Sequence, residues 1–160
     1  MFGKMELKIS AIGRQGRDGI NSFFDEYRGR FDAQARKLGW RNLQFEARDI
    51  RPANRDKERA WLMAQCDGAG LIIALDERGK DLSSLAFADR LKAHAEFGHG
   101  HVQFLIGGAE GLGDELRARA HLLLSMGRMT WPHEMVRVML AEQIFRAACI
   151  LSNHPYHREG

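Results

Sequence analysis

The chain has 160 residues, 44% of them hydrophobic and 28% charged, with a formal net charge of +3. Apolar residues occur throughout and no apolar run approaches the ~20 residues of a membrane span, which excludes disordered, collagen-like and membrane-spanning proteins and predicts one domain over residues 1–160. Two cysteines are too few for a disulfide framework or a thiolate metal site, so we expect a cytoplasmic protein that holds no metal.

The first half of the sequence alternates between the apolar periodicities of strands and of helices. The segment before Gly13 alternates apolar and polar residues, as a half-buried strand does, and a long stretch before Gly39 repeats its apolar residues at helical spacing. The elements expected in this half are a strand over residues 7–12, a helix over 18–38, a strand over 43–47 and a helix over 53–66.

The second half continues the same alternation. A short apolar, β-branched run is typical of a strand covered on both faces, and Ser83 or Ser84 is placed to cap the helix that follows it. The expected elements are strands over residues 70–75, 102–106 and 121–124, a helix from Ser83 or Ser84 to Ala95, a short helical stretch around Leu116, and a helix over 133–151. This order predicts an α/β fold, with a mostly parallel sheet and helices on both of its faces.

The last expected helix, over residues 133–151, is apolar on nearly all of its sides. One face packed on the sheet would bury only about half of its apolar residues. The surplus is explained either by a second copy of the chain, in a homodimer, or by a central position in the core of a monomer. Glu142 and Arg146 lie four residues apart on this helix, in the order that favours an intrahelical ion pair.

Three loops are expected to follow strands at the edge of the sheet where parallel sheets bind their ligands. They comprise residues 75–80, 107–113 and 125–132, and the second is rich in glycine, which leaves its backbone accessible to a ligand. Any one of them is most simply explained as a tight turn. Three of them at consecutive strand ends predict a ligand pocket.

Several common catalytic motifs are absent from the sequence. Residues 107–111 lack the spacing of a dinucleotide fingerprint, no phosphate-binding Lys-Ser or Lys-Thr follows a glycine pair, and no serine lies in a nucleophile elbow. Arg137 stands where a zinc protease helix has its second histidine. His94, His99 and His101 cluster without carboxylates or cysteines at metal-ligand spacing. The sequence therefore lacks the residues needed for hydride transfer, nucleotide hydrolysis, zinc proteolysis or serine hydrolysis.

Two features favour an anionic polymer as partner. Residues 1–60 carry 14 Lys and Arg against 9 Asp and Glu, and most of these cations are arginines, whose guanidinium suits phosphate. Near the carboxyl terminus, Tyr156, His157 and Arg158 bring together an aromatic ring, an imidazole and a guanidinium, which can stack on a nucleobase and hold a phosphate. For the basic residues of the first part, the alternative is a solvated face with local ion pairs. For the tail, the alternative is a disordered polar end.

Ordered motifs along most of the chain are similar to those of one family. They are Leu75-Asp-x-x-Gly-Lys80 with Ser83-Ser84, Phe104-Leu-Ile-Gly-Gly108 with Gly111-Leu112, Met129-Thr-x-Pro-His133, Arg137-Val with Ala141-Glu-Gln-x-x-Arg-Ala147, and Pro155-Tyr-His-Arg158. In these motifs the chain resembles the RlmH family, the pseudouridine methyltransferases of large-subunit ribosomal RNA in the SPOUT class. The likeness is densest over residues 71–158.

The resemblance implies a fold, a cofactor and partners. The fold would be a SPOUT-like α/β sheet whose C-terminal segment forms a deep trefoil knot, and the protein would be a homodimer. Using S-adenosyl-L-methionine, it would methylate the imide nitrogen (position three) of a pseudouridine in 23S ribosomal RNA, on the assembled ribosome. Residues at the family's cofactor positions are Leu75, Gly107, Met126, Gly127, Arg128, Met129, Thr130 and Trp131, which fall in the three expected loops.

The resemblance also gives the tail a role, since in the family the tail of one subunit helps to form the site of the other. Tyr156, His157 and Arg158 are therefore the expected catalytic residues. We expect His157 to accept the imide proton or to orient the base, and Arg158 to stabilise the developing anion or to hold phosphate.

The chain departs from the family's usual pattern at two places. Met126-Gly127 stands where the family usually has Leu-Ser, and Phe145 stands where a tyrosine is common. Each departure removes a hydroxyl. Two rival functions remain: a SPOUT methyltransferase of another RNA, such as tRNA, and a ribosome-binding protein without turnover.

Overall fold

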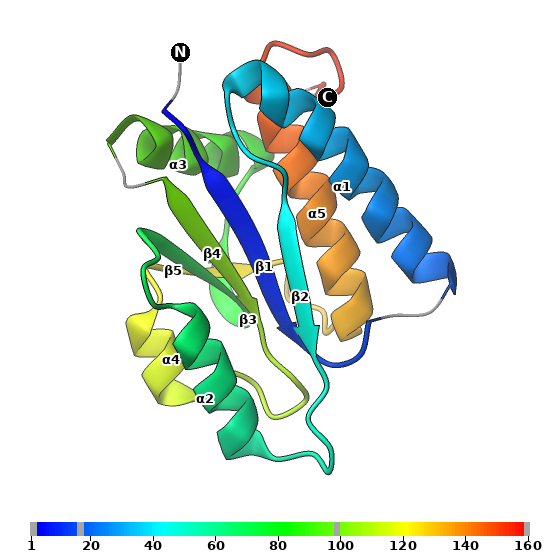
Figure 1. The fold of residues 1–160 in the computed structure, drawn as a ribbon, viewed down its shortest axis with the longest axis vertical. Coiled ribbons are helices and arrows are strands. Elements are labelled where there is room, and N and C mark those ends of the chain that lie inside the picture. Colours follow the sequence, from blue (N-terminus) through cyan, green and yellow to red (C-terminus); the bar gives the residue numbers. More distant parts are fainter. Residues whose placement is uncertain (1–2, 16–17, 98–99, 159–160) are drawn as a thin grey trace.

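The computed structural model describes residues 3–15, 18–97 and 100–158 (Figure 1). The elements are β1 (Glu6–Ile12), α1 (Asp18–Leu38), β2 (Gln44–Arg48), α2 (Arg55–Gln65), β3 (Leu71–Asp81), α3 (Ser84–Phe97), β4 (His101–Ile106), α4 (Gly113–Arg119), β5 (Leu122–Ser125) and α5 (His133–Leu151). The strands form one sheet in the order β2-β1-β4-β3-β5, and each neighbouring pair is parallel. The predicted α/β fold with a parallel sheet is thus confirmed.

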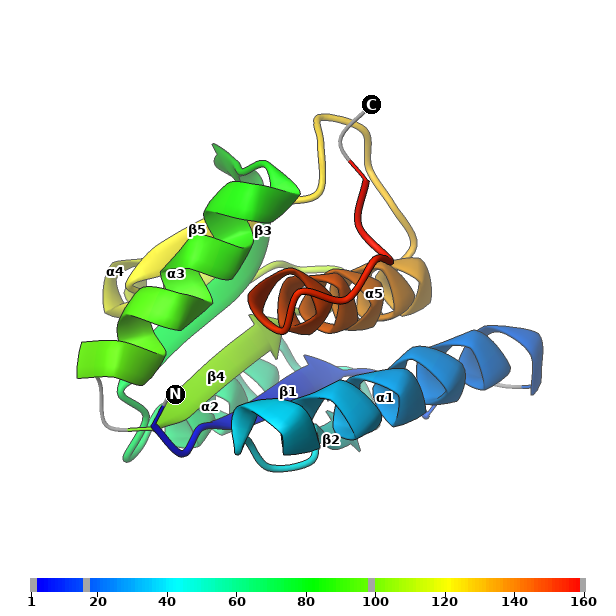
Figure 2. The ribbon, with the colours of Figure 1, turned by 90° about the horizontal axis from the view of Figure 1, so that it is seen from above.

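Helices cover both faces of the sheet, as expected. On one face α5 lies between α1 and α3, and on the other α2 packs against α4 (Figure 2). The alternation of β1 divides its side chains between the layers, because successive residues of a strand point to opposite faces. Leu7 and Ile9 are buried beneath α1, α3 and α5, whereas Ile12 is buried with residues of α2 and α4.

Local signals in the sequence set the ends of several helices. Gly39 follows α1 with φ of 76°, a conformation that glycine adopts without strain, and ends that helix as predicted. The Ser83 hydroxyl accepts a hydrogen bond from the Ala86 backbone N–H (3.0 Å) and caps α3. The second helix begins later than predicted, because the Asn54 side chain caps it by accepting from the Lys57 N–H (3.0 Å).

The strand predicted over residues 70–75 is longer in the structure, so the prediction of a loop at 75–80 was wrong. β3 continues to Asp81 because β5 pairs with it on both sides of a bulge: Leu124 lies opposite Leu75 and, after a shift in register, opposite Lys80. Gly79 permits this close pairing, since a Cβ there would lie 2.5 Å from the Leu123 carbonyl oxygen. A bulge within a strand therefore stands where a loop was expected.

Candidate active site

A pocket of about 320 Å³ opens at the carboxyl ends of the strands. The bulge of β3, the loops after β4 and β5, and the first turn of α5 line it together. Its lining includes seven of the eight residues at the family's cofactor positions, namely Leu75, Gly107, Met126, Gly127, Met129, Thr130 and Trp131. Arg128 is exposed and is not among the lining residues. The three segments singled out in the sequence thus meet around one cavity.

The glycine-rich loop after β4 owes its shape to close backbone packing. Gly108 and Gly111 form an isolated antiparallel bridge, with the Gly111 N–H donating to the Gly108 carbonyl (3.0 Å). A Cβ on Gly107 would lie 3.2 Å from both the Gly111 carbonyl carbon and the Leu112 Cδ2 atom. From outside, Arg59 Nη2 donates to the Glu110 carbonyl oxygen (2.7 Å) and holds the loop against α2. A side chain at the start of this turn would therefore crowd Gly111 and Leu112, which would have to shift to admit it.

The loop after β5 closes on itself through one serine. The Ser125 hydroxyl donates to the Gly127 carbonyl oxygen (2.8 Å), and the Gly127 N–H donates back to the Ser125 Oγ atom (3.0 Å). Gly127 has φ of 111°, which L residues rarely adopt. The departure from the family's usual Leu-Ser therefore coincides with a backbone conformation that favours glycine.

Acidic side chains supply part of the polar wall of the pocket. The Asp76 side chain is only 5% exposed and accepts from Arg117 Nε at 2.7 Å. The Glu77 carboxylate accepts a hydrogen bond from the Thr130 hydroxyl at 3.2 Å. Leu75 and Trp131 contribute apolar surface to the same wall. Mixed walls of this kind suit a ligand with both an apolar body and polar groups.

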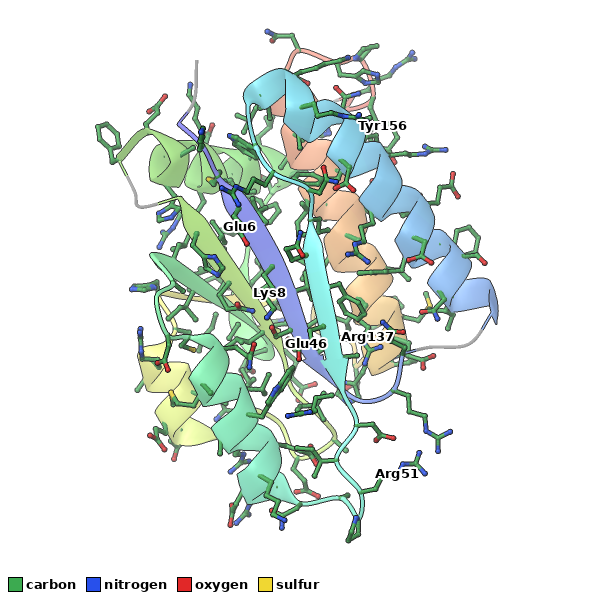
Figure 3. All side chains as sticks on the ribbon, in the orientation of Figure 1. Glu6, Lys8, Glu46, Arg51, Arg137 and Tyr156 are labelled. Carbon is green, nitrogen blue, oxygen red and sulfur yellow. The ribbon has the colours of Figure 1, made fainter. Side chains whose placement is uncertain are left out.

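Arg137 is a buried cation near this edge of the sheet whose role sequence reasoning missed. It is 4% exposed, and its guanidinium donates to the carbonyl oxygens of Ile12 (3.1 Å) and Arg14 (2.6 Å) while lying over the Phe45 ring (Figure 3). Burial lowers the pKa of Arg137. The family motif marks this position, but only the fold reveals that it ties the end of β1 to the start of α5.

The carboxyl-terminal tail folds back on α5 instead of fraying. Asn153 takes a left-handed conformation (φ 58°), and the next N–H, of His154, donates to the Cys149 carbonyl oxygen (2.8 Å). Tyr156 then packs on Phe145, with ring centroids 4.6 Å apart, and its hydroxyl donates to Glu142 Oε1 (2.9 Å). Burial, followed by the Glu142 hydrogen bond, raises the pKa of Tyr156 to about 12. The alternative of a disordered tail is therefore wrong for Tyr156 and His157.

Arg146 connects the tail to the helix. Its Nε and Nη2 atoms donate to Glu142 Oε1 at 3.0 and 2.6 Å, which confirms the predicted ion pair. Its guanidinium lies 4.7 Å from the centroid of the Tyr156 ring, and its Nη1 atom is 3.2 Å from His157 Nδ1. Arg158, the third expected catalytic residue, is exposed.

Pocket and tail lie in different places within one chain. The pocket reaches α5 at Val136, whereas the tail bonds to it at Glu142 and Arg146, up to ten residues or roughly 15 Å further along the helix. In Figure 1 the described part of the tail, which follows α5, lies at the top, and the arrowheads of β1 and β2 point to the bottom. The structure thus gathers the expected site residues into two groups.

A second cavity of about 490 Å³ lies between these two groups. It is bounded by α1, α5 and the start of α3, shares Met126 and Gly127 with the first pocket, and reaches Glu142. None of Tyr156, His157 and Arg158 lines either cavity.

Neither a membrane span nor a metal cluster is found in the described part of the chain. Over residues 3–15, 18–97 and 100–158, no helix has the length and apolar character needed to cross a bilayer. The same residues contain no group of three or more His, Cys, Asp or Glu side chains arranged to hold a metal ion.

Comparison with known proteins was made for sequence and for fold. A family model described as "Predicted SPOUT methyltransferase" matches residues 5–157. Ribosomal RNA large subunit methyltransferase H of Rhodopseudomonas palustris (strain BisA53) is 44% identical, and that of Nitrobacter hamburgensis 45%; each alignment covers 96% of this chain and 99% of the relative. A solved structure of a probable methylase family protein from Haemophilus influenzae has a TM-score of 0.51 at 11% identity, covering 99% of this chain and 72% of that one, a likeness of fold alone.

Proposed function

Because the chain belongs to the SPOUT methyltransferase family, we propose that it methylates large-subunit ribosomal RNA, the activity for which its relatives at 44% and 45% identity are named. The observation that carries the proposal is the meeting of the three family motif segments around one pocket at the carboxyl edge of the sheet. The target is the imide nitrogen of a pseudouridine, as the resemblance to the RlmH family implies.

The residues of the pocket fit S-adenosylmethionine as cofactor. A volume of about 320 Å³ lies within the range of small-molecule sites, and apolar walls with a few polar groups suit a ligand that combines a base, a ribose and a charged amino acid. Gly107 lines the pocket without a side chain, so its backbone is available for contact with such a ligand. Leu75, Gly107 and the segment 126–131 would hold the cofactor, which supplies an electrophilic methyl group when bound.

The tail acts on the base that receives the methyl group. Tyr156 and His157 are held against α5 by Glu142 and Arg146, so their rings have fixed orientations. The exposed guanidinium of Arg158 is available to a phosphate or to an oxygen on which negative charge develops. Fixed positions matter because methyl transfer is an in-line displacement that depends strongly on orientation.

A homodimer supplies the two groups of residues to one site. Since tail and pocket lie apart along α5 in one chain, a tail from a second copy would complete the pocket. The part of α5 beyond the pocket carries half-exposed Val138 and Met139 beside the exposed Met135, and exposed Phe23 lies on neighbouring α1. A second copy of the chain is the occupant of this apolar face, as the surplus apolar residues of the last helix suggested.

The segment after β5 is the part of the chain that we propose to be knotted. β5 lies at the edge of the sheet beyond β3, yet the helix that follows it packs between α1 and α3. To reach that place the chain must pass back across the sheet, and threading of this segment through a loop would make it the deep trefoil knot that the resemblance implies.

The ribosome is the proposed partner, and it places the enzyme in the cytoplasm. Arginines of the amino-terminal third remain exposed in the fold, among them Arg36, Arg48 and Arg51. Exposed guanidinium groups suit the phosphate backbone of RNA.

Transfer of labelled methyl from S-adenosylmethionine tests the proposed function. The substrates are unmethylated ribosomes, isolated large subunits, naked ribosomal RNA and tRNA. Label on assembled ribosomes, mapped to a pseudouridine of the large-subunit RNA, is the expected result. Label on tRNA alone, or no label on any RNA from a protein that binds the cofactor, would overturn it.

A further inference from the structure

Glu142 is the centre of a hydrogen-bond network whose donors and acceptors are all defined. Its Oε1 atom accepts from Arg146 and from the Tyr156 hydroxyl, and its Oε2 atom accepts from Gln143 Nε2 at 3.0 Å. Gln143 in turn accepts from the Ser84 hydroxyl at 2.8 Å. The carboxylate is therefore used on both oxygens, and Arg146 is fixed in one orientation.

The contact between Arg146 and His157 has only one possible polarity. A guanidinium has no acceptor, so in the 3.2 Å contact the Nη1 atom donates and His157 Nδ1 accepts. The hydrogen bond with Glu142 raises the pKa of Arg146 further, which keeps the guanidinium charged. A proton on Nδ1 would face the guanidinium N–H, so the neutral ring carries its proton on Nε2.

The other ring nitrogen of His157 has no partner within the described chain. Nε2 is buried and makes no hydrogen bond with residues 3–15, 18–97 or 100–158. A buried N–H without an acceptor costs roughly 1–3 kcal/mol, so this nitrogen calls for an acceptor that the described residues do not supply. The tail thus presents a donor in need of an acceptor.

We propose that Arg146 is a positioning residue that fixes His157 as the Nε2–H tautomer, so that neither ring nitrogen is free to accept the proton of the target base. That the proton in question is the imide proton of a base rests on the proposed function. The proton leaves to solvent, since Nδ1 is occupied and Nε2 is already protonated.

Nitrogen NMR of the full chain with isotope-labelled histidine tests the tautomer directly. The shifts of the two ring nitrogens distinguish Nε2–H from Nδ1–H and from the imidazolium, and the signal lost in His157→Gln identifies the residue. We expect Nε2–H for the wild-type protein near neutral pH. A wild-type ring protonated on Nδ1, alone or together with Nε2, would overturn the proposal. This measurement needs no RNA, so it stands even if the methylation test above fails.

Variants of Arg146 separate positioning from simple support of the fold. Arg146→Met removes the donor and should give a mixture of tautomers, whereas Arg146→Lys keeps a donor and should retain Nε2–H. The control is Arg55→Met, which breaks an exposed ion pair with Asp56 on α2, on the opposite face of the sheet from α5 and the tail, and should leave the His157 signals unchanged. His157 signals that do not change in Arg146→Met would contradict the proposal.

Two replacements of His157 test the catalytic consequence. A glutamine amide lies close to the position of Nε2, and an asparagine amide lies close to that of Nδ1. A glutamine keeps an N–H near the Nε2 position and cannot take up a proton, so if His157 is not the base, methylation of ribosomes by His157→Gln should exceed that by His157→Asn at least about fivefold. Equal loss in both variants would indicate a proton acceptor and would overturn the proposal.

Discussion

The pocket is shaped mainly by backbone and the tail network by side chains, and this difference determines which substitutions each tolerates. The pocket is shaped by backbone: a glycine turn after β4, a bulge in β3 and a serine-closed loop after β5. The tail network is made of side chains that share the two oxygens of Glu142. In the pocket, Gly127 stands where the family usually has serine, and the loop keeps its hydrogen bonds with Ser125. In the tail, one donor atom, Arg146 Nη1, determines which ring nitrogen of His157 carries the proton. We therefore expect the pocket to tolerate substitutions that leave its backbone path intact, and the tail to be sensitive to the loss of any one side chain of the network.

Filling the glycine turn should have the largest effect. Gly107→Val would place side-chain atoms against Gly111 and Leu112, so we expect the affinity for S-adenosylmethionine to fall at least about a hundredfold by calorimetry. Gly29→Val is the matched control, because a Cβ at that exposed position of α1 meets nothing within 4 Å. Native cofactor affinity in Gly107→Val would refute the location of the cofactor.

Removing the tail side chains should affect turnover and spare cofactor binding. For His157→Ala and Arg158→Ala we expect methylation of ribosomes to fall at least about tenfold, because positioned donors and charges act on the base in the transition state. Neither residue lines the pocket, so the affinity measured by calorimetry should stay near that of the wild type. Unchanged methylation by both variants would exclude the tail from catalysis.

Much of this arrangement could be predicted from the sequence, for identifiable reasons. Periodicity located the strands and helices, and the rule for parallel sheets predicted that residues 107–113 and 125–132 would meet. Periodicity ended one strand at residue 75 and so predicted a loop at residues 75–80, which was wrong. β5 pairs with β3 on both sides of a bulge, and this pairing depends on a contact between distant segments.

The tail network was less accessible to sequence reasoning. The i,i+4 spacing predicted the contact between Glu142 and Arg146, since it depends only on helical geometry. The contact of Arg146 with His157 could not be predicted, because it depends on the reversal of the chain at Asn153. Arg137 was recognised only as part of a motif, since its partners Ile12 and Arg14 lie 125 and 123 residues away in the sequence and only the fold brings them together.

A conservative change in the pocket wall should have a small effect. Thr130→Val removes the hydroxyl that donates to Glu77, and Glu77 is exposed, so water replaces the lost donor. We expect cofactor affinity to change by less than about threefold, in keeping with a net hydrogen bond of roughly 0.5 kcal/mol at an exposed site. A loss comparable to that of Gly107→Val would show that side chains, rather than backbone, make this site.

Ionisation of Tyr156 should give the smallest effect, visible only at high pH. Its pKa is about 12 in the folded protein, against about 10 in an unfolded chain. Between these values the folded protein keeps a proton that the unfolded chain has lost, so the tyrosine's stabilising contribution is complete below about pH 10 and is lost as pH rises to about 12.

Tyrosinate absorbance checks this directly, because the chain has only 2 tyrosines. The wild-type titration minus that of Tyr156→Phe should show a single group titrating near pH 12. A difference centred near the ordinary value of about 10 would mean that the tail does not bury this ring.

Complementation between two inactive variants tests most directly whether pocket and tail come from different subunits. Gly107→Val and His157→Ala chains, carrying different tags, are co-expressed, and the mixed dimer is purified through both tags. One of its two sites then combines an intact pocket with an intact tail, so methylation of ribosomes should recover to roughly half of the wild-type rate. Activity no higher than that of the two variants measured separately would contradict a site shared between subunits.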